Sequence, residues 1–127
     1  MTWRWIDQRL LGLLHDESLA MHGGASGLGD AGLLESALSR PLSLSVCGEP
    51  DVAALAARYA SSLFQNRPFV DGNKRAAFLS MGLFLGLNGR RLTASQAEAT
   101  VAMLGLACGD VDEAIFAAWL RERIASR

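Results

Sequence analysis

The stretch Phe78-Leu79-Ser80-Met81-Gly82-Leu83-Phe84-Leu85-Gly86-Leu87 decides the fold of this chain. Its apolar residues surround a helical axis instead of lining one side of it, which is typical of a helix buried on most sides. We expect this helix to begin around Gly72-Asn73 and to close at Asn88-Gly89. The stretch therefore predicts a helical bundle built around one central helix.

Helical spacing recurs before this central helix, and no stretch shows the sustained alternation of a half-buried strand. A first helix is expected from about Asp7 to Met21, stopped by Gly23-Gly24. A second should run from Ala31 to Ser39, with Asp30 as its cap and Pro41 preventing its continuation. A third should run from Pro50-Asp51 to near Arg67, because Pro68 follows. The expected inward residues are Leu10, Leu11, Leu14 and Leu19 in the first helix, and Val52, Leu55, Tyr59 and Leu63 in the third.

Two capping signals follow the central helix. Thr93-Ala94-Ser95-Gln96 has capping-box spacing, with Thr93 as the acceptor and Gln96 reaching back, and its helix should end at Gly109. Asp110-Val111-Asp112-Glu113 predicts a sixth helix, whose inward residues would be Val111, Ile115, Trp119 and Ile124. The sequence thus predicts an all-α fold, a single domain over residues 1–127 with about six helices.

Composition excludes several classes of protein. A chain of 127 residues, half of them apolar and a fifth charged, is a compact domain and not a disordered one. The net charge of -1 gives no general attraction to nucleic acid or to an anionic membrane. Cys47 and Cys108 are too few for a disulfide framework, so we expect two partly buried structural thiols. With no signal peptide and no apolar run that would cross a bilayer, the expected location is cytoplasmic.

The loop before the central helix, Arg67-Pro68-Phe69-Val70-Asp71-Gly72-Asn73-Lys74-Arg75, is the one segment that carries chemistry. It places charged residues at a helix start, where backbone N–H groups lack partners and the macrodipole adds partial positive charge. Gly72 lets a ligand approach the backbone, and Lys74 and Arg75 add two cations. Asp71 beside them can hold Mg2+ through one carboxylate. The loop therefore predicts a site for nucleotide phosphate with magnesium.

The same run also has a purely structural interpretation. Pro, Asp, Gly and Asn are turn-forming residues, and Lys74-Arg75 would then be solvated surface charge. From the residues alone, the two interpretations of the 67–75 loop are about equally supported.

The loop resembles the signature of the Fic/Doc superfamily, His-x-Phe-x-(Asp/Asn)-(Gly/Ala)-Asn-(Lys/Gly)-Arg, and in particular its death-on-curing (Doc) toxin branch. The resemblance covers nearly the whole chain. It extends to His15-Asp16, Gly23-Gly24, the run Gly27-Leu28-Gly29-Asp30-Ala31-Gly32-Leu33-Leu34-Glu35-Ser36-Ala37-Leu38, Arg40-Pro41 and the close from Leu85 to Gly89. It implies the Fic/Doc fold and a toxin of a toxin–antitoxin pair.

The resemblance also implies roles for single residues. Asp71 matches the magnesium-binding acid, and Phe69 the buried anchor of the loop. The anion-hole residues correspond to Gly72, Asn73 and Lys74, and the arginine that grips nucleotide phosphate corresponds to Arg75.

Two positions bear on the type of reaction. Members that transfer AMP usually carry Gly-Asn-Gly-Arg-x-x-Arg, whereas Lys74 and Phe78 stand here in place of the second glycine and the second arginine. This matches the death-on-curing version, which resembles a kinase. That version moves the terminal phosphate of ATP, with Mg2+, to a threonine of elongation factor Tu and blocks translation. AMP transfer is the alternative reaction.

Arg67 departs from the family pattern, which has at this position the histidine that takes the proton from the target hydroxyl. Arginine does not deprotonate in proteins, and losing a general base costs a factor of about 100 to 10,000 in rate. Three explanations stay open: a substitution that disarms a growth-arresting toxin, a natural member that binds nucleotide or partner without chemistry, and a base supplied by another residue.

The remaining candidates have simpler interpretations. His15 and His22 are expected to be helix-packing or capping residues, and Trp3, Trp5 and Trp119 core or interface anchors. The resemblance further implies an antitoxin partner whose disordered C-terminal segment folds onto the helical surface. A non-catalytic module that binds nucleotide or antitoxin is the competing function.

Overall fold

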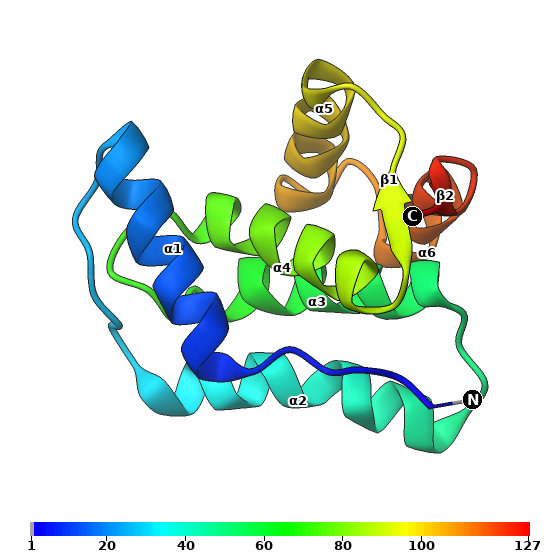
Figure 1. Ribbon diagram of the computed structural model, residues 1–127, viewed down its shortest axis with the longest axis horizontal. Coiled ribbons are helices and arrows are strands. Elements are labelled where there is room, and N and C mark those ends of the chain that lie inside the picture. The colour runs from blue at the N-terminus through cyan, green and yellow to red at the C-terminus, as the bar shows by residue number, and fades with distance from the viewer. Residues whose placement is uncertain (1) are drawn as a thin grey trace.

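The computed structural model describes residues 2–127, and six helices make up most of it (Figure 1). This confirms the predicted helical fold. The elements in chain order are α1 (Gln8–His22), α2 (Ala31–Cys47), α3 (Val52–Asn66), α4 (Asn73–Leu87), β1 (Arg90–Leu92), α5 (Gln96–Ala107), α6 (Glu113–Arg121) and β2 (Ile124–Ser126).

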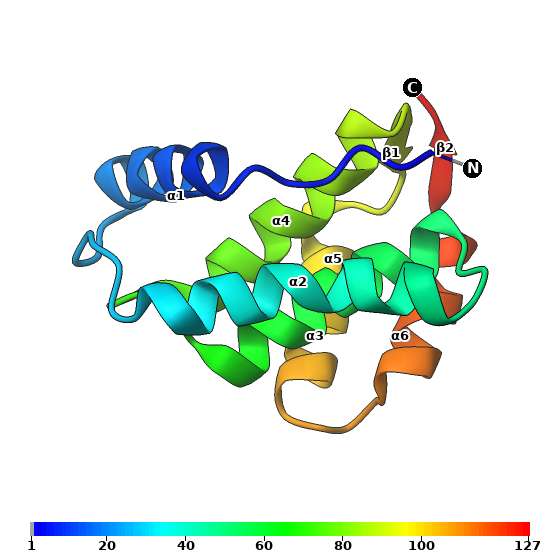
Figure 2. The ribbon, with the colours of Figure 1, turned by 90° about the horizontal axis from the view of Figure 1, so that it is seen from below.

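Two helices, α3 and α4, share the centre of the molecule. They lie along each other, and α2 and α6 pack against α3 while α1 packs against α4 (Figures 1 and 2). Nine of the 15 residues of α3 are buried, against six of 15 in α4. The prediction of a buried central helix after the 67–75 loop is correct, but α3 is the more buried of the pair. Its alanines, which a count of large apolar residues overlooks, let neighbouring backbones approach closely; they are Ala53, Ala56, Ala57 and Ala60.

The second helix is longer than predicted, because Pro41 does not end it. The helix continues to Cys47 with Pro41 inside, although proline removes one backbone hydrogen bond there. The buried residues recur at helical spacing through the proline, so the packing of this face against α3 offsets the lost bond. That face consists of Leu34, Ala37, Leu38 and Pro41.

Five of the six helices of residues 2–127 begin at an acidic or hydroxyl side chain that accepts a backbone N–H bond. These caps are Asp7, Asp30, Asp51, Ser95 and Asp112. The start of α4 differs, since Gly72 stands there and no side chain accepts from its first turn. The macrodipole of α4 therefore meets the 67–75 loop without an acidic cap.

The expected capping box lies two residues away from its predicted place. Ser95 accepts from the Glu98 N–H, and the Glu98 carboxylate accepts from the Ser95 N–H. Thr93 instead donates its hydroxyl to the Arg123 carbonyl, which joins the segment before α5 to the end of α6. The run Ser95-Gln96-Ala97-Glu98 has the same capping-box spacing as the predicted one, and the structure uses it.

Two short strands were not predicted. β1 and β2 pair antiparallel, with Leu92 opposite Ile124, so Ile124 belongs to a strand and not to the sixth helix. Three-residue strands are too short to show the alternation on which prediction depends.

Several burial predictions were also wrong. In the first helix Leu11 and Leu19 are buried as predicted, but Leu10 is exposed; in the sixth helix Ile115 is exposed and the buried face begins one residue later, at Phe116. Cys47 and Cys108 are exposed free thiols rather than partly buried ones. Among residues 2–127, no helix is both long enough and apolar enough to span a membrane.

The N-terminal segment braces the far end of α4. Trp3 and Trp5 pack against Phe84, with ring centroids 6.1 and 5.8 Å away. Asn88 closes α4 and exchanges two hydrogen bonds with the backbone of Arg4, at 2.9 and 3.0 Å. The two tryptophans are thus packing anchors, as predicted.

Candidate functional site

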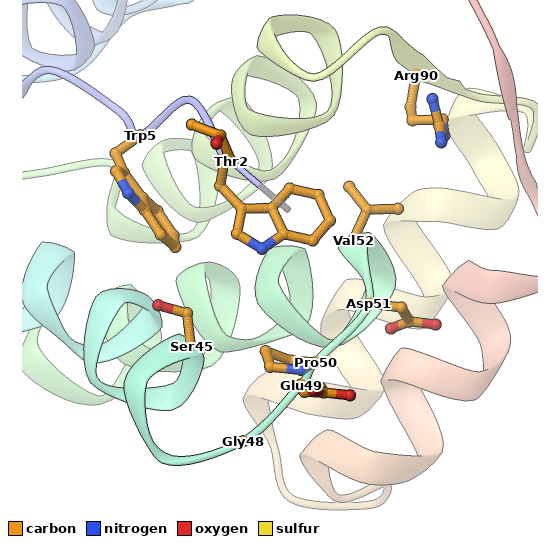
Figure 3. Close-up of a pocket in the computed structure, with 10 residues that line it drawn as sticks. Thr2, Trp5, Ser45, Gly48, Glu49, Pro50, Asp51, Val52 and Arg90 are labelled. Carbon is orange, nitrogen blue, oxygen red and sulfur yellow. The ribbon is translucent and has the colours of Figure 1, made fainter.

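Several hollows open on the surface formed by residues 2–127, and three of them differ in their chemistry. The first, of about 900 Å³, lies between the N-terminal segment and the connection from α2 to α3 (Figure 3). It holds Glu49, Asp51 and Arg90, but Asp51 is engaged by Arg121, and this mixture of charges suits no phosphate. The second, of about 810 Å³, lies between α5 and α6 and is lined mainly by apolar side chains, including Val101, Leu104 and Trp119.

The third hollow, of about 390 Å³, is the one that the 67–75 loop lines. Its walls are Phe64, Arg67, Val70, Asp71, Gly72, Asn73, Lys74 and Ala107. Five of the residues predicted for the site therefore meet around one space. Phe69 and Arg75 do not line it: Phe69 is buried beneath the loop, and Arg75 points a guanidinium nitrogen at the Gly23 carbonyl, 3.3 Å away.

A glycine-rich segment, residues 23–29, runs beside the 67–75 loop and holds its backbone. Val70 donates to the Gly27 carbonyl at 3.1 Å, and Gly29 donates to the Pro68 carbonyl at 2.8 Å. Leu28 and Phe69 form an isolated antiparallel bridge between them. A Cβ on Gly29 would lie 3.1 Å from the Pro68 carbonyl oxygen, so this close approach favours glycine. The sequence predicted Gly23-Gly24 as a helix stop and as part of the family resemblance, but it did not predict that this segment holds the loop.

Asn73 braces the loop from the inside. Its amide oxygen accepts from the Phe69 N–H, and its amide nitrogen donates to the Phe69 carbonyl, both at 3.0 Å. The side chain of Asn73 thereby makes two hydrogen bonds within the protein, one at each end of its amide. The part of Asn73 left to face a ligand is its backbone N–H, in the uncapped first turn of α4.

Asp71 presents an ionised carboxylate to the solvent side of the loop. One oxygen accepts from the Ala25 N–H at 3.2 Å and the other from the Gly72 N–H at 2.8 Å. These two hydrogen bonds, the one from Ala25 first, hold the pKa of the Asp71 carboxyl below its ordinary value. Each oxygen keeps a further lone pair for a cation.

His15 lies directly beneath the loop, as the packing residue that the sequence predicted. Its ring is fully buried, and its Nε2 lies 2.8 Å from the Asp71 carbonyl oxygen. The ring also packs against Phe69, with centroids 4.3 Å apart. His22 is exposed at the end of α1. Neither histidine lines the hollow.

Gly72 has a left-handed backbone, with φ of 71° and ψ of 31°, and starts α4. A Cβ there would come within 2.8 Å of the His15 ring, so both the conformation and the space favour glycine. The backbone N–H groups of the first turn have no side-chain acceptor. Lys74 is exposed at this end and adds a positive charge.

Arg67 ends α3 in a left-handed conformation that is rare for a residue with a side chain, with φ of 48° and ψ of 56°. Its N–H donates to the Leu63 carbonyl at 3.0 Å, which closes the helix. Its exposed side chain lines the hollow together with Lys74, so the hollow receives one cation from before Asp71 in the sequence and one from after it.

These residues fit a magnesium ion that arrives with a nucleotide better than a metal ion held by protein side chains alone. Among residues 2–127, no group of three or more His, Cys, Asp or Glu side chains gathers to hold a metal ion. Asp71 alone is a single carboxylate, and Mg2+ is commonly bound by one or two carboxylates together with substrate phosphates and water. The uncapped helix start and Lys74 supply the complementary anion site.

Comparison with known proteins finds a matching family model and relatives of similar sequence. The family model described as Fic/DOC family matches residues 5–85. The chain is 39% identical over 74 residues to Toxin Doc of Mycolicibacterium smegmatis, a match that covers 57% of each protein. It is 31% identical over 124 residues to Protein kinase doc of Escherichia phage P1, a match that covers 97% of this chain and 98% of that protein.

Proposed function

This chain belongs to the Fic/DOC family, and on that basis we propose that it is a Doc-type toxin of a toxin–antitoxin pair. Its site is built to transfer the terminal phosphate of ATP to a protein hydroxyl. The observation that supports this most is the hollow in which Asp71, Lys74 and the uncapped start of α4 meet. A relative that matches nearly its whole length is named a protein kinase.

Phosphoryl transfer asks a protein for positioning and charge neutralisation more than for covalent chemistry. In this proposal the N–H groups of the first turn of α4, beginning with that of Asn73, and the Lys74 ammonium donate to phosphate oxygens, while the Gly72 N–H stays on the Asp71 carboxylate. Asp71 holds Mg2+, which when bound neutralises charge on the transferred group. Arg75, tethered to the Gly23 carbonyl, adds positive charge from the side.

The proton of the attacking hydroxyl has no acceptor at the family's usual position. As the hydroxyl oxygen bonds to the terminal phosphorus and the bond to the ADP oxygen breaks, the hydroxyl proton must leave. Arg67 is permanently protonated and cannot take it. Its positive charge is nevertheless compatible with bound phosphate. The chain as it stands therefore has a binding site for ATP and a greatly slowed transfer step.

No other residue that lines the hollow is suited to act as the general base. Its lining contains no histidine, and Asp71 is committed to two backbone N–H groups and to the metal. His15 is sealed behind the backbone of Asp71 and Gly72. The explanation in which a further residue supplies the base therefore has the least support of the three.

Transfer of phosphate is favoured over transfer of AMP by position 78. A second arginine one turn after Arg75 would be needed to grip the nucleotide in the AMP-transferring arrangement. Phe78 is instead partly buried and packs against the core. The terminal phosphate is then the group that faces the target, which we take to be a threonine of elongation factor Tu.

Reversion of position 67 tests the proposal. Arg67→His is expected to arrest bacterial growth on induction and to move labelled terminal phosphate from ATP to elongation factor Tu. The intact mass of the target distinguishes a gain of one phosphate from a gain of one AMP. Arg67→His combined with Asp71→Asn is the matched control, and it should be harmless. A folded, well-expressed Arg67→His chain with full viability and no transfer would contradict the proposal.

A non-catalytic module is the second candidate, and Arg67 itself is the observation that favours it. In that case the Arg67→His chain would bind ATP and Mg2+ without transferring phosphate. In either case we expect a cytoplasmic protein with an antitoxin partner whose C-terminal segment folds on the toxin. A short antitoxin gene beside this one, and co-purification of its product with this chain, would support the pair. If calorimetry shows no binding of ATP with Mg2+, the phosphate site itself is refuted.

A further inference from the structure

His15 is the one buried histidine of the chain, and the transfer reaction outlined above does not use it. Its ring has no exposure to solvent and sits on the inward face of α1, between Leu11 and Leu19. One of its nitrogens, Nδ1, is buried without a hydrogen-bond partner among the described residues. A buried polar atom without a partner costs free energy, so favourable contacts of the rest of the ring must offset this cost.

The other nitrogen of the ring makes such a contact. Nε2 lies 2.8 Å from the Asp71 carbonyl oxygen. A carbonyl oxygen only accepts, so the hydrogen must be on Nε2 and the ring donates it. The bare lone pair is then left on Nδ1, in agreement with the absence of a donor there. The geometry thus fixes the tautomer.

This hydrogen bond holds the peptide group that joins Asp71 to Gly72, between two residues of the candidate site. On one side of that peptide is the carboxylate proposed to hold magnesium, and on the other is the left-handed glycine that starts α4. The ring also packs closely on Gly72, because a Cβ on that residue would lie 2.8 Å from the Cε1 atom of the ring. The ring also contacts Phe69, the anchor of the same loop.

We propose that His15 is a positioning residue, which sets the direction of the Asp71 carboxylate and of the first N–H groups of α4 through the Asp71–Gly72 peptide. The proposal rests on the proposed function for its effect on ligand binding, but its effect on the loop itself does not depend on that function. Loss of a group that orients a metal ligand typically lowers the affinity for the metal by about 10- to 100-fold.

Two variants separate donation from packing. His15→Met fills the space without a donor, whereas His15→Gln returns an amide N–H at a similar distance from the backbone. We expect His15→Met to weaken ATP·Mg2+ in calorimetry by about tenfold or more and His15→Gln to stay within about threefold of the parent chain. Without ligand, His15→Met should speed hydrogen exchange at the amides of Ala25 and Gly72, which donate to Asp71.

Leu11→Ala is the control, because Leu11 is a buried residue one turn earlier on α1. It should lower the melting temperature yet leave the affinity of the folded chain and these two amides unchanged. If His15→Met behaves like Leu11→Ala, the proposal is overturned.

Nitrogen NMR of the parent chain gives a test that needs no variant. A hydrogen on Nε2 of His15 supports the proposal, and a hydrogen on Nδ1 alone overturns it, even if His15→Met fails to fold. Should the parent chain bind no ATP with Mg2+, the proposed function fails, while the exchange rates and the ring tautomer still decide the role of His15.

Discussion

Phe69 and Asn73 hold each other by two hydrogen bonds, which run in opposite directions between one side-chain amide and one peptide backbone, each 3.0 Å long. The pair closes the turn between them, so that Val70, Asp71 and Gly72 project from a rigid base. The Asn73 side chain therefore shapes the loop, and the backbone N–H of Asn73 is the group available for the proposed anion site.

Replacing Asn73 by alanine should loosen this turn. Both hydrogen bonds are lost, each worth about 1 kcal/mol, while the higher helix propensity of alanine returns a fraction of that. We expect Asn73→Ala to lower the free energy of unfolding by about 1–2 kcal/mol in urea denaturation. Unchanged stability would show that the turn does not depend on this pair.

Arg67 offers a way to separate backbone strain from charge. Its left-handed conformation costs a residue with a Cβ about 1 kcal/mol relative to glycine. Arg67→Gly removes the cation and the strain, whereas Arg67→Ala removes the cation alone. The glycine variant should therefore be more stable than the alanine variant by about 1 kcal/mol.

Both substitutions at position 67 should weaken binding of ATP with Mg2+ to the same extent, because both remove the same charge from the hollow. Calorimetry beside thermal unfolding measures the two effects on the same samples. Equal stability of the two variants would argue against the left-handed conformation, and affinities equal to that of the parent chain would argue against contact between Arg67 and phosphate.

The ionisation of Asp71 should show in the acid range. Hydrogen bonds from Ala25 and Gly72 place the pKa of its carboxyl below the ordinary value of 3.8. A lowered pKa means that the folded state is favoured at pH values above 3.8 and loses this contribution as the pH falls through the folded pKa. Carbon NMR of the Asp71 carboxyl should give a midpoint below 3.8, and a midpoint at or above it would contradict these bonds.

In stability measurements, the difference between the parent chain and Asp71→Asn should be constant between neutral pH and about pH 5 and should shrink below 3.8. A difference that grows on acidification would have the wrong sign for a carboxylate stabilised in its charged form.

Asp51 does two jobs that substitution can separate. It caps α3 by accepting from the Ala54 N–H, and it binds the Arg121 side chain of α6, which lowers the pKa of the Asp51 carboxyl. Asp51→Ala should cost about 1–2 kcal/mol and Asp51→Ser clearly less, since serine also caps. Arg121→Ala should cost less than about 1 kcal/mol, because the ion pair is half exposed. Chemical denaturation of the three variants gives the order.

The helices were predictable where local chemistry decides them. Pro68 sets the end of α3, and the apolar run from Phe78 to Leu87 defines α4. Prediction failed where tertiary contacts outweigh local preference. Pro41 stays helical because its buried face packs on α3, and Ile124 joins a strand because β1 lies beside it. Such contacts are not encoded in the spacing of one segment.

The site was partly predictable for the same reason. The 67–75 loop and the gathering of Arg67, Asp71 and Lys74 follow from one contiguous motif. Ala25, which donates to the Asp71 carboxylate, lies 46 residues earlier in the chain, and only the fold brings it there. The signal available in the sequence was the spacing of Gly23, Gly24, Gly27 and Gly29, which is more glycine than a helix stop requires.

Because the glycine-rich segment pairs with the 67–75 loop, the affinity for nucleotide depends on the fraction of molecules in which the two segments are paired. These backbone bonds join two loops and not two core helices, and local opening of such loops costs less than unfolding of the core. A molecule in which residues 23–29 have lifted away would keep its helices yet leave Asp71 without the Ala25 N–H. The apparent affinity for nucleotide then equals the intrinsic affinity multiplied by the closed fraction. Anything that binds the open form would disarm the molecule by mass action, without touching the phosphate site itself.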